Sequence, residues 1–402
     1  MDREVASRLP STYKTAQRLW RHSLHTVCSR VAMFPAQMVH YFLLRYTESG
    51  DFVADYWAGM GTVPLEASLN GRLSLGNDIS PEAFAVLQAK LNPPTPEELA
   101  GYMKRLEDSV VGHLGEDLDS LGESLGVRCY YHKKTLQEML SIRRTLEEDL
   151  ESSSRAKNRA ATFTRALMLG ILHGDRTESI SIPLDSSKAL SIKHVKRMKK
   201  KFPVEYRARH KRPVVDSLRI KAEKVMKDPF LPLRGIARNT DASRLSLPKK
   251  AKMVFTSPPY LATHTYAYDN RIRLWFLHED YRLVGRKLFD TDSTDWYLDY
   301  MVRSLRNIEE GLDSNSTCFL VVGDVRNDKG ELVRLGELIS NAWKDAASTE
   351  MEVTRIITDR IRPTRRRYFN LRKSDGPRFE RILEFHNGKP LENAVSIDWR
   401  SP

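Results

Sequence analysis

A short tract, Ser257-Pro258-Pro259-Tyr260, combines residue types that converge on one chemistry. Residues 252–255 predict a strand, and Thr256 connects that strand to the tract. Two prolines fix the backbone and remove two N–H donors, which leaves carbonyl and hydroxyl oxygens to accept hydrogen bonds. The tyrosine offers a face on which a planar ring can stack. The tract therefore predicts a site for an amino group on a planar ring, and the alternative is a plain Pro-Pro turn.

A second candidate site lies at residues 55–62, which read Asp-Tyr-Trp-Ala-Gly-Met-Gly-Thr. A glycine turn after a strand lets the backbone approach a ligand at the carboxyl edge of an open α/β sheet. The spacing is Gly-x-Gly rather than Gly-x-Gly-x-x-Gly, so a dinucleotide is not favoured. The alternative is a merely tight turn.

Asp78 ends the next predicted strand. An acid at this position can bind both hydroxyls of a ribose, as it does in nucleoside-cofactor folds. The alternative is an acid at the N-terminal end of a helix, because Ser80 and Pro81 follow.

The elements around these residues alternate between strand and helix. Strands are predicted at 51–55, 73–78, 252–255 and 318–322, and helices at 63–69, 81–90, 293–312 and 331–343. Residues 350–357 and 381–385 predict an antiparallel hairpin. Strand, glycine turn, helix and strand in succession begin a parallel α/β sheet. Between the prolines at 93–96 and about residue 230, long amphipathic helices such as 135–150 predict a separate, mainly helical lobe.

Positive charge is concentrated in part of that lobe. The formal net charge is +13, and residues 193–227 hold 14 Lys or Arg against three acids. A second basic cluster lies between residues 360 and 373. Concentrated positive charge suits a polyanion such as nucleic acid. The alternative is a solvated surface, since charge runs are common.

Composition argues against several other classes of protein. Hydrophobic residues make up 41% of the 402 residues, so wholesale disorder is not expected. The three cysteines, Cys28, Cys129 and Cys318, lie far apart, which disfavours a disulfide framework or a thiolate zinc site and fits a reducing cytosol. No apolar run is long enough to span a membrane, and the charged N-terminus lacks a signal core. Neither a metal nor a membrane is therefore a predicted partner.

Together these segments resemble the S-adenosylmethionine-dependent DNA amino-methyltransferases, specifically the N4-cytosine type. That type carries Ser-Pro-Pro-Tyr, as at 257–260, whereas N6-adenine enzymes usually have Asp or Asn in place of Ser257. Residues 55–62 match the family's Asp-Pro-Phe-x-Gly-x-Gly-Thr loop, with departures at Tyr56 and Trp57. The resemblance covers about residues 25–92 and 235–386. The cofactor loop precedes the catalytic tract, which differs from the commonest order in N4-cytosine enzymes.

The resemblance implies a Rossmann-like α/β methyltransferase fold with a mostly parallel seven-stranded sheet and a mainly helical inserted lobe. We expect residues 1–94 to hold the N-terminal helices and the cofactor-binding part, 95–230 the basic insertion that recognises DNA, and 231–402 the catalytic part. The implied cofactor is S-adenosyl-L-methionine. Its predicted ligands are Phe34, Pro35, Asp55, Trp57, Ala58, Gly59, Gly61, Thr62, Asp78 and Asp241.

The implied reaction is transfer of a methyl group to the N4 amine of cytosine in double-stranded DNA, on a base flipped out of the duplex. Its predicted catalytic residues are Ser257, Pro258, Pro259 and Tyr260. The predicted DNA contacts are Lys196, Arg197, Lys199, Lys200, Lys201, Arg365, Arg366 and Arg367.

Two alternatives remain open on sequence alone. One is the same chemistry on adenine N6 in DNA or on an RNA base amine. The other is a non-catalytic nucleic-acid-binding protein on the same fold. The resemblance is compatible with a restriction-modification or defence system, a cognate restriction endonuclease as partner, and a cytoplasmic, nucleoid-associated location. The sequence decides neither a recognition site nor between monomer and dimer.

Overall fold

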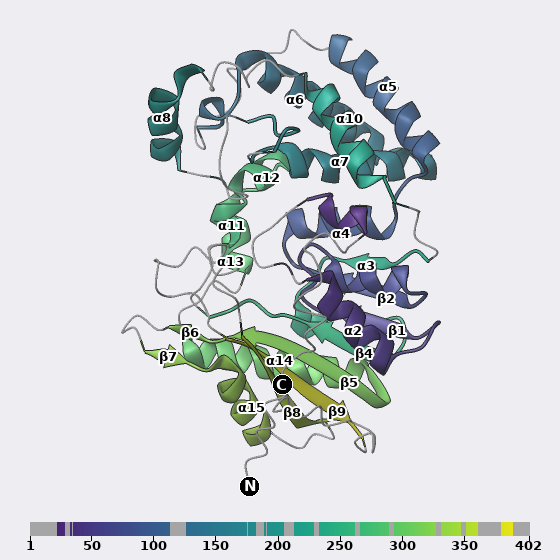
Figure 1. Cartoon of the computed structure of the whole chain (residues 1–402), viewed down its shortest axis with the longest axis vertical. Coiled ribbons are helices and arrows are strands. Elements are labelled where there is room, and N and C mark those ends of the chain that lie inside the picture. Colours follow the sequence, from purple (N-terminus) through teal and green to yellow (C-terminus); the bar gives the residue numbers. More distant parts are fainter. Residues whose placement is uncertain are drawn as a thin grey trace, which may run out of the picture.

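A computed structural model gives the fold (Figure 1). It describes residues 22–28, 33, 35–112, 126–174, 176–181, 189, 191–204, 213–228, 233–261, 266–288, 293–326, 331–346, 351–360 and 379–388. A twisted sheet with flanking helices occupies one end of the molecule, and a group of helices occupies the other. No helix among these residues is long and apolar enough to cross a membrane.

Seven strands form the main sheet, in the order β3-β2-β1-β4-β5-β9-β8. Neighbours from β3 to β5 pair in parallel, whereas β9 runs antiparallel to both β5 and β8. This is the mostly parallel, Rossmann-like sheet that the sequence predicted. In sheet order the strands are β3 (Ile236–Arg238), β2 (Leu73–Asn77), β1 (Phe52–Asp55), β4 (Ala251–Thr256), β5 (Leu312–Gly323), β9 (Phe379–Asn387) and β8 (Met351–Arg360).

The strand order reverses between β1 and β4. From β1 the chain proceeds to β2 and β3 on one side, and it then returns to β4 on the other side of β1. Open α/β sheets bind ligands in the crevice outside the carboxyl ends of the strands at such a switch point. The residues that follow β1 and β4, namely 55–62 and 257–260, therefore meet where a ligand is expected.

Helices cover both faces of the sheet, because successive side chains along each strand point to opposite faces and most of them are apolar. One face packs against α2 (Ala36–Tyr46) and α3 (Thr62–Leu69), and its side chains include Val53, Met253, Phe255 and Phe319. The other packs against α14 (Thr294–Gly311) and α15 (Leu335–Asp345), and its side chains include Ala54, Val254, Leu320 and Phe385. The strands read as continuous apolar runs because helices cover both faces.

Several elements differ from the sequence expectation at their ends. The two strands of the predicted hairpin are longer than predicted, since β8 continues to Arg360 and β9 runs from Phe379 to Asn387. The strand predicted at 318–322 begins earlier, at Leu312, and its residues 313–315 are exposed. The helix predicted from residue 331 begins at Leu335, because Leu332–Val333 forms β7 and pairs with β6 (Val325–Arg326). The early start of β5 lies at a polar segment, where strand periodicity is weak.

The helical lobe shares one hydrophobic core with α4 (Pro81–Leu91) of the α/β part. Its elements are α5 (Pro96–Gly112), η4 (Val127–Cys129), α6 (Lys133–Leu150), α7 (Arg155–Ile171), α8 (Ile192–Lys201) and α10 (Val214–Val225). Helix η1 (Ser23–Thr26) packs against α10, so an N-terminal segment lies in the lobe. Three short helices, α11 (Tyr266–Asp269), α12 (Arg271–Phe276) and α13 (Tyr281–Lys287), lie between the two parts (Figure 1).

Buried arginines fasten α12 to this lobe. Arg271 donates to the Tyr130 hydroxyl at 2.9 Å and to the Ala189 carbonyl at 2.8 Å. Arg273 donates through Nε to the Leu169 carbonyl at 3.1 Å. The chain that leaves the 257–260 tract is thus attached to the basic lobe by charged groups that are costly to release.

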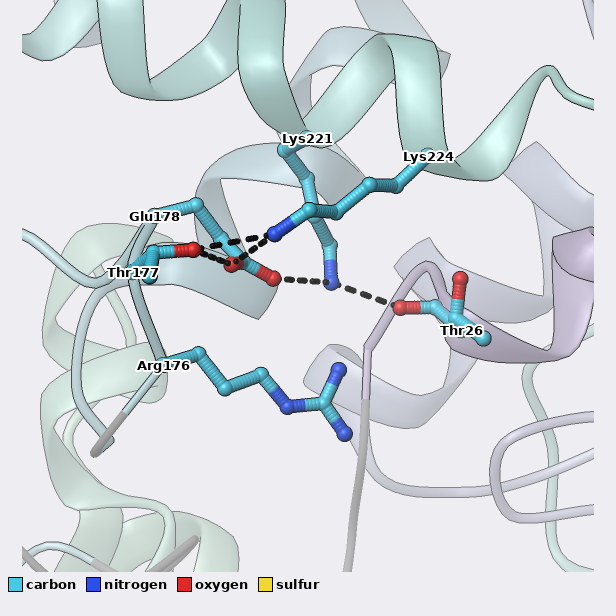
Figure 2. A pocket seen from close by; sticks show the side chains of 6 residues that line it. All are labelled: Thr26, Arg176, Thr177, Glu178, Lys221 and Lys224. Atoms are coloured by element: carbon cyan, nitrogen blue, oxygen red, sulfur yellow. Dashed lines mark hydrogen bonds and ion pairs between the residues drawn. The ribbon is translucent and has the colours of Figure 1, made fainter. Parts of the chain in front are cut away.

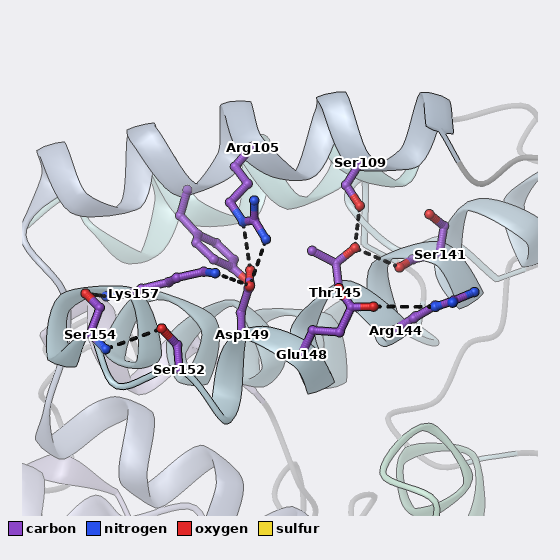
Figure 3. A network of polar contacts seen from close by, with 11 residues as sticks. Arg105, Ser109, Ser141, Arg144, Thr145, Glu148, Asp149, Ser152, Ser154 and Lys157 are labelled. Carbon is purple, nitrogen blue, oxygen red and sulfur yellow. Dashed lines mark hydrogen bonds and ion pairs between the residues drawn. The ribbon is translucent and has the colours of Figure 1, made fainter.

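Within the lobe, a buried carboxylate joins three helices (Figure 3). The side chain of Asp149 is fully buried at the end of α6. It accepts hydrogen bonds from the Arg105 guanidinium at 2.9 and 3.0 Å, from the Tyr102 hydroxyl at 2.9 Å and from Lys157 Nζ at 2.6 Å. Burial would raise the pKa of Asp149, but these three donors outweigh burial and lower it.

Replacing Asp149→Asn should lower the free energy of unfolding by about 1–3 kcal/mol at pH 7, because charged partners lose their acceptor. The loss should fade as the pH falls below about 4, since a lowered pKa contributes stability only while the carboxyl is ionised. Urea unfolding measures both effects. Asp299→Asn is the control, because its pair with Arg303 is exposed and should change stability by less than about 0.5 kcal/mol. Equal losses in the two variants would contradict the role of Asp149.

Candidate active site

Side chains from the ends of β1 and β4 join at the switch point. The Thr256 hydroxyl donates to Asp55 Oδ1 at 2.7 Å and accepts the backbone N–H of Trp57 at 3.1 Å. The same N–H lies 3.3 Å from Asp55 Oδ1. One hydroxyl therefore connects the first residue of the 55–62 loop with the strand that leads into Ser257.

Asp55 is almost fully buried, with 1% of its surface exposed. Burial raises the pKa of Asp55 to about 8, although the bonds from Thr256 and Trp57 oppose the shift and the nearby Asp78 charge adds to it. A carboxyl with this pKa is mostly protonated at neutral pH. A cationic ligand group beside it would favour the ionised form.

Tyr56 anchors the loop to α14. Its side chain is buried and its hydroxyl donates to the Asn307 carbonyl in α14 at 3.2 Å. Asn307 Nδ2 in turn donates to the carbonyls of Ala242 and Leu245 at 2.7 and 3.0 Å. A Cβ on Gly311 would lie 2.4 Å from the Tyr56 hydroxyl, so glycine leaves room for this contact. The loop is thus held by a buried tyrosine where the resembled family usually has proline.

The two glycines of the loop, Gly59 and Gly61, differ in what surrounds their Cα atoms. Gly61 has φ +73°, a left-handed backbone conformation that favours glycine, and a Cβ there would lie 2.8 Å from Leu87 Cδ1. Gly59 has φ +51°, and a Cβ there would meet nothing within 4 Å. Backbone at Gly59 therefore borders open space. The turn is fixed by hydrogen bonds from Gly61 N to the Ala58 carbonyl at 2.7 Å and from Lys90 Nζ to the Met60 carbonyl at 2.5 Å.

Asp78 lies against this turn. Its Oδ2 accepts the N–H of Gly59 at 2.8 Å, and its Oδ1 accepts the N–H of Ser80 at 2.9 Å. The neighbouring Asn77 is buried and donates to the carbonyls of Tyr56 and Thr240, each at 3.0 Å. The carboxylate is consequently held in one orientation at the carboxyl edge of β2, half-buried and beside the open face of Gly59.

Asp241 lies in the loop that Asn77 and Asn307 hold. It is the N-cap of η5 (Ala242–Arg244), and its Oδ1 accepts both the N–H and the hydroxyl of Ser243 at 2.8 Å. This capping explains the position of the side chain. Binding of a cofactor by Asp241 stays a prediction.

The 257–260 tract combines an oriented hydroxyl with a packed ring. Ser257 Oγ donates to the Val321 carbonyl of β5 at 2.9 Å. Because its proton is used in this bond, the oxygen can serve a further group only as an acceptor. Tyr260 is hydrogen-bonded to Ser257, is 8% exposed, and belongs to the core cluster that includes Tyr297 and Tyr300; burial raises its pKa. The ring is therefore inside the protein, and its stacking on a substrate stays a prediction.

Sequence reasoning missed Tyr300 in α14. Its hydroxyl accepts a hydrogen bond from Trp57 Nε1 at 3.0 Å, and the two rings meet edge to face at 6.2 Å between centroids. Burial raises the pKa of Tyr300, and the negative charges of Asp241 and Asp78 also contribute. Tyr300 thus fixes the Trp57 ring near both acids. From sequence, the helical spacing of Tyr300 indicates only that its side chain packs in the core.

The remaining predicted residues are distributed as follows. Pro35 is the N-cap of α2, Ala58 is buried, and Thr62 opens α3 and is buried. Phe34, Arg365, Arg366 and Arg367 lie outside the described residues. Within the described part of the chain, no group of three or more His, Cys, Asp or Glu side chains could hold a metal ion.

The predicted DNA contacts at 196–201 belong to α8. Lys196, Arg197, Lys200 and Lys201 are exposed, and Lys199 is half-exposed. Val195 is the buried residue of this helix. Helix α8 therefore exposes several positive charges, and it lies at the side of the lobe (Figure 1).

Comparison with known proteins gives one sequence match and distant structural similarity. No curated protein matches the chain. Similar solved structures include TrmN from Thermus thermophilus, with 8% identity and a TM-score of 0.35 over 90% of this chain and 52% of that one, so the chain spans about half of it. A putative RNA methyltransferase from Pyrococcus horikoshii has 9% identity and a TM-score of 0.34 over 94% and 96% of the two chains. Similarity at this level supports no conclusion about substrate.

The sequence match is more specific. Residues 9–89 match the model of a family described as DNA methylase, which carries the name N6_N4_Mtase. The matched segment includes β1, the glycine loop and Asp78. S-adenosylmethionine is the cofactor that this family implies. The match and the order of the seven strands together support an S-adenosylmethionine-dependent methyltransferase.

Proposed function

We propose that this protein methylates the exocyclic N4 amine of cytosine in double-stranded DNA. The observation that carries the proposal is the hydrogen bond between Thr256 and Asp55. This bond joins the end of β1, which the glycine loop follows, to the end of β4, which Ser257 follows. A cofactor site and an amine acceptor then share one edge of the sheet. The DNA methylase family match favours a base in DNA as the acceptor.

The residues at this edge fit the chemical groups of S-adenosylmethionine. When bound, this cofactor supplies a methyl group activated on a sulfonium sulfur. The open face of Gly59 leaves room for a ligand beside the loop, and Asp78 offers fixed carboxylate oxygens to hydroxyl groups. Asp55 offers a carboxyl whose ionisation a positive charge would favour.

Ser257 is suited to hold the amine of the substrate. Its Oγ already donates to Val321, so it accepts a hydrogen bond from an N–H. Such a bond, with another to the Pro258 carbonyl, would draw the amine lone pair out of conjugation with the ring. The effect is catalytic when the acceptors are held before the reaction. Ser at position 257, rather than Asp or Asn, favours cytosine over adenine as the base.

The amine of a paired cytosine lies inside the duplex, so the base must leave the stack to reach this site. Helix α8 offers exposed positive charge for the phosphate backbone. Arg271 and Arg273 attach α12 to the lobe that carries α8. Binding of DNA by the lobe would therefore be coupled mechanically to the segment after the 257–260 tract.

Asp78→Ala should weaken S-adenosylmethionine binding by about 2–4 kcal/mol, because charge-assisted hydrogen bonds are lost and Gly59 loses its acceptor. Calorimetric titration of the folded variant measures this. Asp313→Ala, an exposed acid at the opposite end of β5, is the control and should bind the cofactor like the wild type. Unchanged affinity in Asp78→Ala would remove this residue from the site.

Ser257→Ala should retain cofactor affinity within about twofold and lose about 10²-fold in methyl transfer, as when one preorganised hydrogen bond is removed. Tyr260→Ala should also lose most activity, whereas Tyr260→Phe, which keeps the ring, should lose less if stacking matters. Mass spectrometry of nucleosides after incubation with labelled cofactor identifies the product. N6-methyladenine, or a methylated RNA base, would change the substrate but not the reaction class. Full activity in both alanine variants would refute the mechanism.

Reversing the charges of Lys199, Lys200 and Lys201 to Glu should weaken DNA binding and flatten its salt dependence, because fewer counterions are released. Cofactor binding should hardly change. The control reverses Lys104, Lys133 and Lys134, which are exposed in the same lobe and change the net charge equally. Fluorescence anisotropy across a salt series gives both slopes. If the two triple variants behave alike, α8 has no special role in binding.

A further inference from the structure

An exposed tyrosine lies close to the candidate active site. Tyr268 belongs to α11, the first helix after the 257–260 tract that the structure describes, and the residue is 43% exposed. Burial is the main cause that raises the pKa of Tyr260, and Glu380 and Tyr266 contribute to the shift through their charge. Tyr266, at the start of α11, therefore lies near the Tyr260 ring. Helix α11 has one end beside the 257–260 tract and exposes an aromatic ring two residues further on.

The Tyr268 ring is held in place by two neighbours. The Arg271 guanidinium lies 4.2 Å from the ring centroid, which is a cation–π contact. Arg271 is buried, and hydrogen bonds to the Ala189 carbonyl and the Tyr130 hydroxyl hold it there. The Tyr281 ring meets the Tyr268 ring edge to face, at 5.9 Å between centroids. A ring fixed in this way loses little side-chain freedom when a planar group stacks on it.

Exposed positive charge lies next to this ring on α13, the helix that carries Tyr281. Helix α13 packs against α11, and its residues Arg282, Arg286 and Lys287 are exposed. Arg282 and Arg286 are one helical turn apart, so they lie on the same face of the helix. Asp280 is the N-cap of α13, and its carboxylate accepts the N–H of Arg282 at 2.7 Å. The helix therefore presents three cations beyond its capped N-terminus.

The basic helix α8 is connected to α11 from another direction. The N–H of Ala189 donates to the Asp269 carbonyl of α11 at 2.9 Å, and the Ala189 carbonyl accepts from Arg271 at 2.8 Å. Ser191, two residues later, is the N-cap of α8. In Figure 1, α8, α11 and α13 lie along the same side of the molecule. Helix α11 is therefore adjacent to two helices that carry exposed cations.

Other cations of the lobe form contacts inside the protein. A cavity of about 310 Å³ is lined by Thr26, Arg176, Thr177, Glu178, Lys221 and Lys224 (Figure 2). Lys224 Nζ donates to Glu178 Oε2 at 2.7 Å, and Lys221 Nζ donates to the Thr26 carbonyl at 2.7 Å. These contacts join η1 and α10 to the segment that follows α7. The cations of α8 and α13 lie on the surface instead, where a polyanion can reach them.

We propose that Tyr268 and the exposed cations of α8 and α13 bind a single-stranded stretch of DNA, with one unpaired base stacked on the Tyr268 ring. Every base has an aromatic face, and proteins that bind single strands combine aromatic rings with positive charge that follows the backbone. The inference rests on the proposed function, because a base that leaves the duplex creates unpaired DNA beside the 257–260 tract. It adds a second base contact, separate from the site of the methylated base.

Fluorescence anisotropy with a labelled single-stranded DNA oligonucleotide of mixed sequence tests the stacking contact. Tyr268→Leu keeps an apolar side chain but removes the ring, so it should weaken binding about fivefold or more, as the loss of one stacked base does. Tyr268→Phe keeps the ring and should bind within about twofold of the wild type. Equal affinity in Tyr268→Leu and the wild type, or no binding by the wild type, would overturn the proposal.

The matched control for this series is Tyr41→Leu. The Tyr41 ring also has an arginine beside it, since Arg45 lies 4.6 Å from its centroid, but both residues belong to α2, away from α11 in Figure 1. Tyr41→Leu should therefore bind the oligonucleotide like the wild type. An equal loss of affinity in Tyr41→Leu and Tyr268→Leu would mean that the removal of any such ring weakens binding, and the proposal would fail.

Photocrosslinking of the wild-type protein gives a readout that a structural role of Tyr268 would not produce. Irradiation of DNA that contains 5-iodouracil joins this base to an aromatic side chain stacked on it, and mass spectrometry of the digested protein should locate the link at Tyr268. Links at other residues only would overturn the stacking contact. Tighter binding of RNA of the same sequence, with the same dependence on Tyr268, would overturn DNA as the partner.

None of these measurements uses the cofactor or methyl transfer, so the two proposals fail in different ways. A wild-type protein that crosslinks DNA through Tyr268 but forms no N4-methylcytosine would refute the proposed reaction alone. A protein that forms N4-methylcytosine, and whose Tyr268→Leu variant binds single-stranded DNA like the wild type, would refute the stacking site alone.

Discussion

The hydroxyl of Thr256 is the contact on which the candidate site depends. It donates to a buried carboxyl, Asp55, and accepts a backbone N–H, that of Trp57. A buried carboxyl without such a partner would be costly, since its burial already raises the pKa to about 8. The end of β1 and the end of β4 are consequently held in one arrangement, and the glycine loop and Ser257 lie beside each other because of it.

Three asparagine or tyrosine side chains extend this arrangement into the surrounding loops. Asn77 connects Tyr56 with Thr240, and Tyr56 and Asn307 connect the glycine loop with the loop of Asp241 through α14. The site is therefore supported from behind by polar side chains that donate to backbone carbonyls, and Asn77 Oδ1 also accepts the backbone N–H of Thr240 at 3.0 Å. Such a network orients the ligand-facing residues before any ligand arrives, which is what preorganised catalysis requires.

Much of the fold could be predicted from the sequence, because its apolar runs and glycine turns are local signals. Strands β1, β2 and β4, helices α3, α4 and α14, and the β8–β9 hairpin all lie where the pattern indicated. The tracts at 55–62 and 257–260 could be predicted as neighbours, since parallel strands end at one edge. Asn307 and Tyr300 could not, because their partners in the glycine loop lie more than 240 positions away and α14 has only an ordinary amphipathic pattern. The buried ring of Tyr260 was also unpredictable, since exposure depends on packing against α14.

The basic run at 193–227 shows why net charge alone does not define a function. In α8 most lysines are exposed, and Val195 is the buried residue of the helix. Exposed charges of this kind attract salt ions and polyanions over long distances. In α10, Lys221 is buried and paired with a carboxylate and a backbone carbonyl, so its charge acts within one cavity. Exposed charge governs how strongly and how quickly a polyanion associates, whereas enclosed charge selects the shape and valence of one anionic group. The two helices therefore place positive charge in two different settings within one short stretch of sequence.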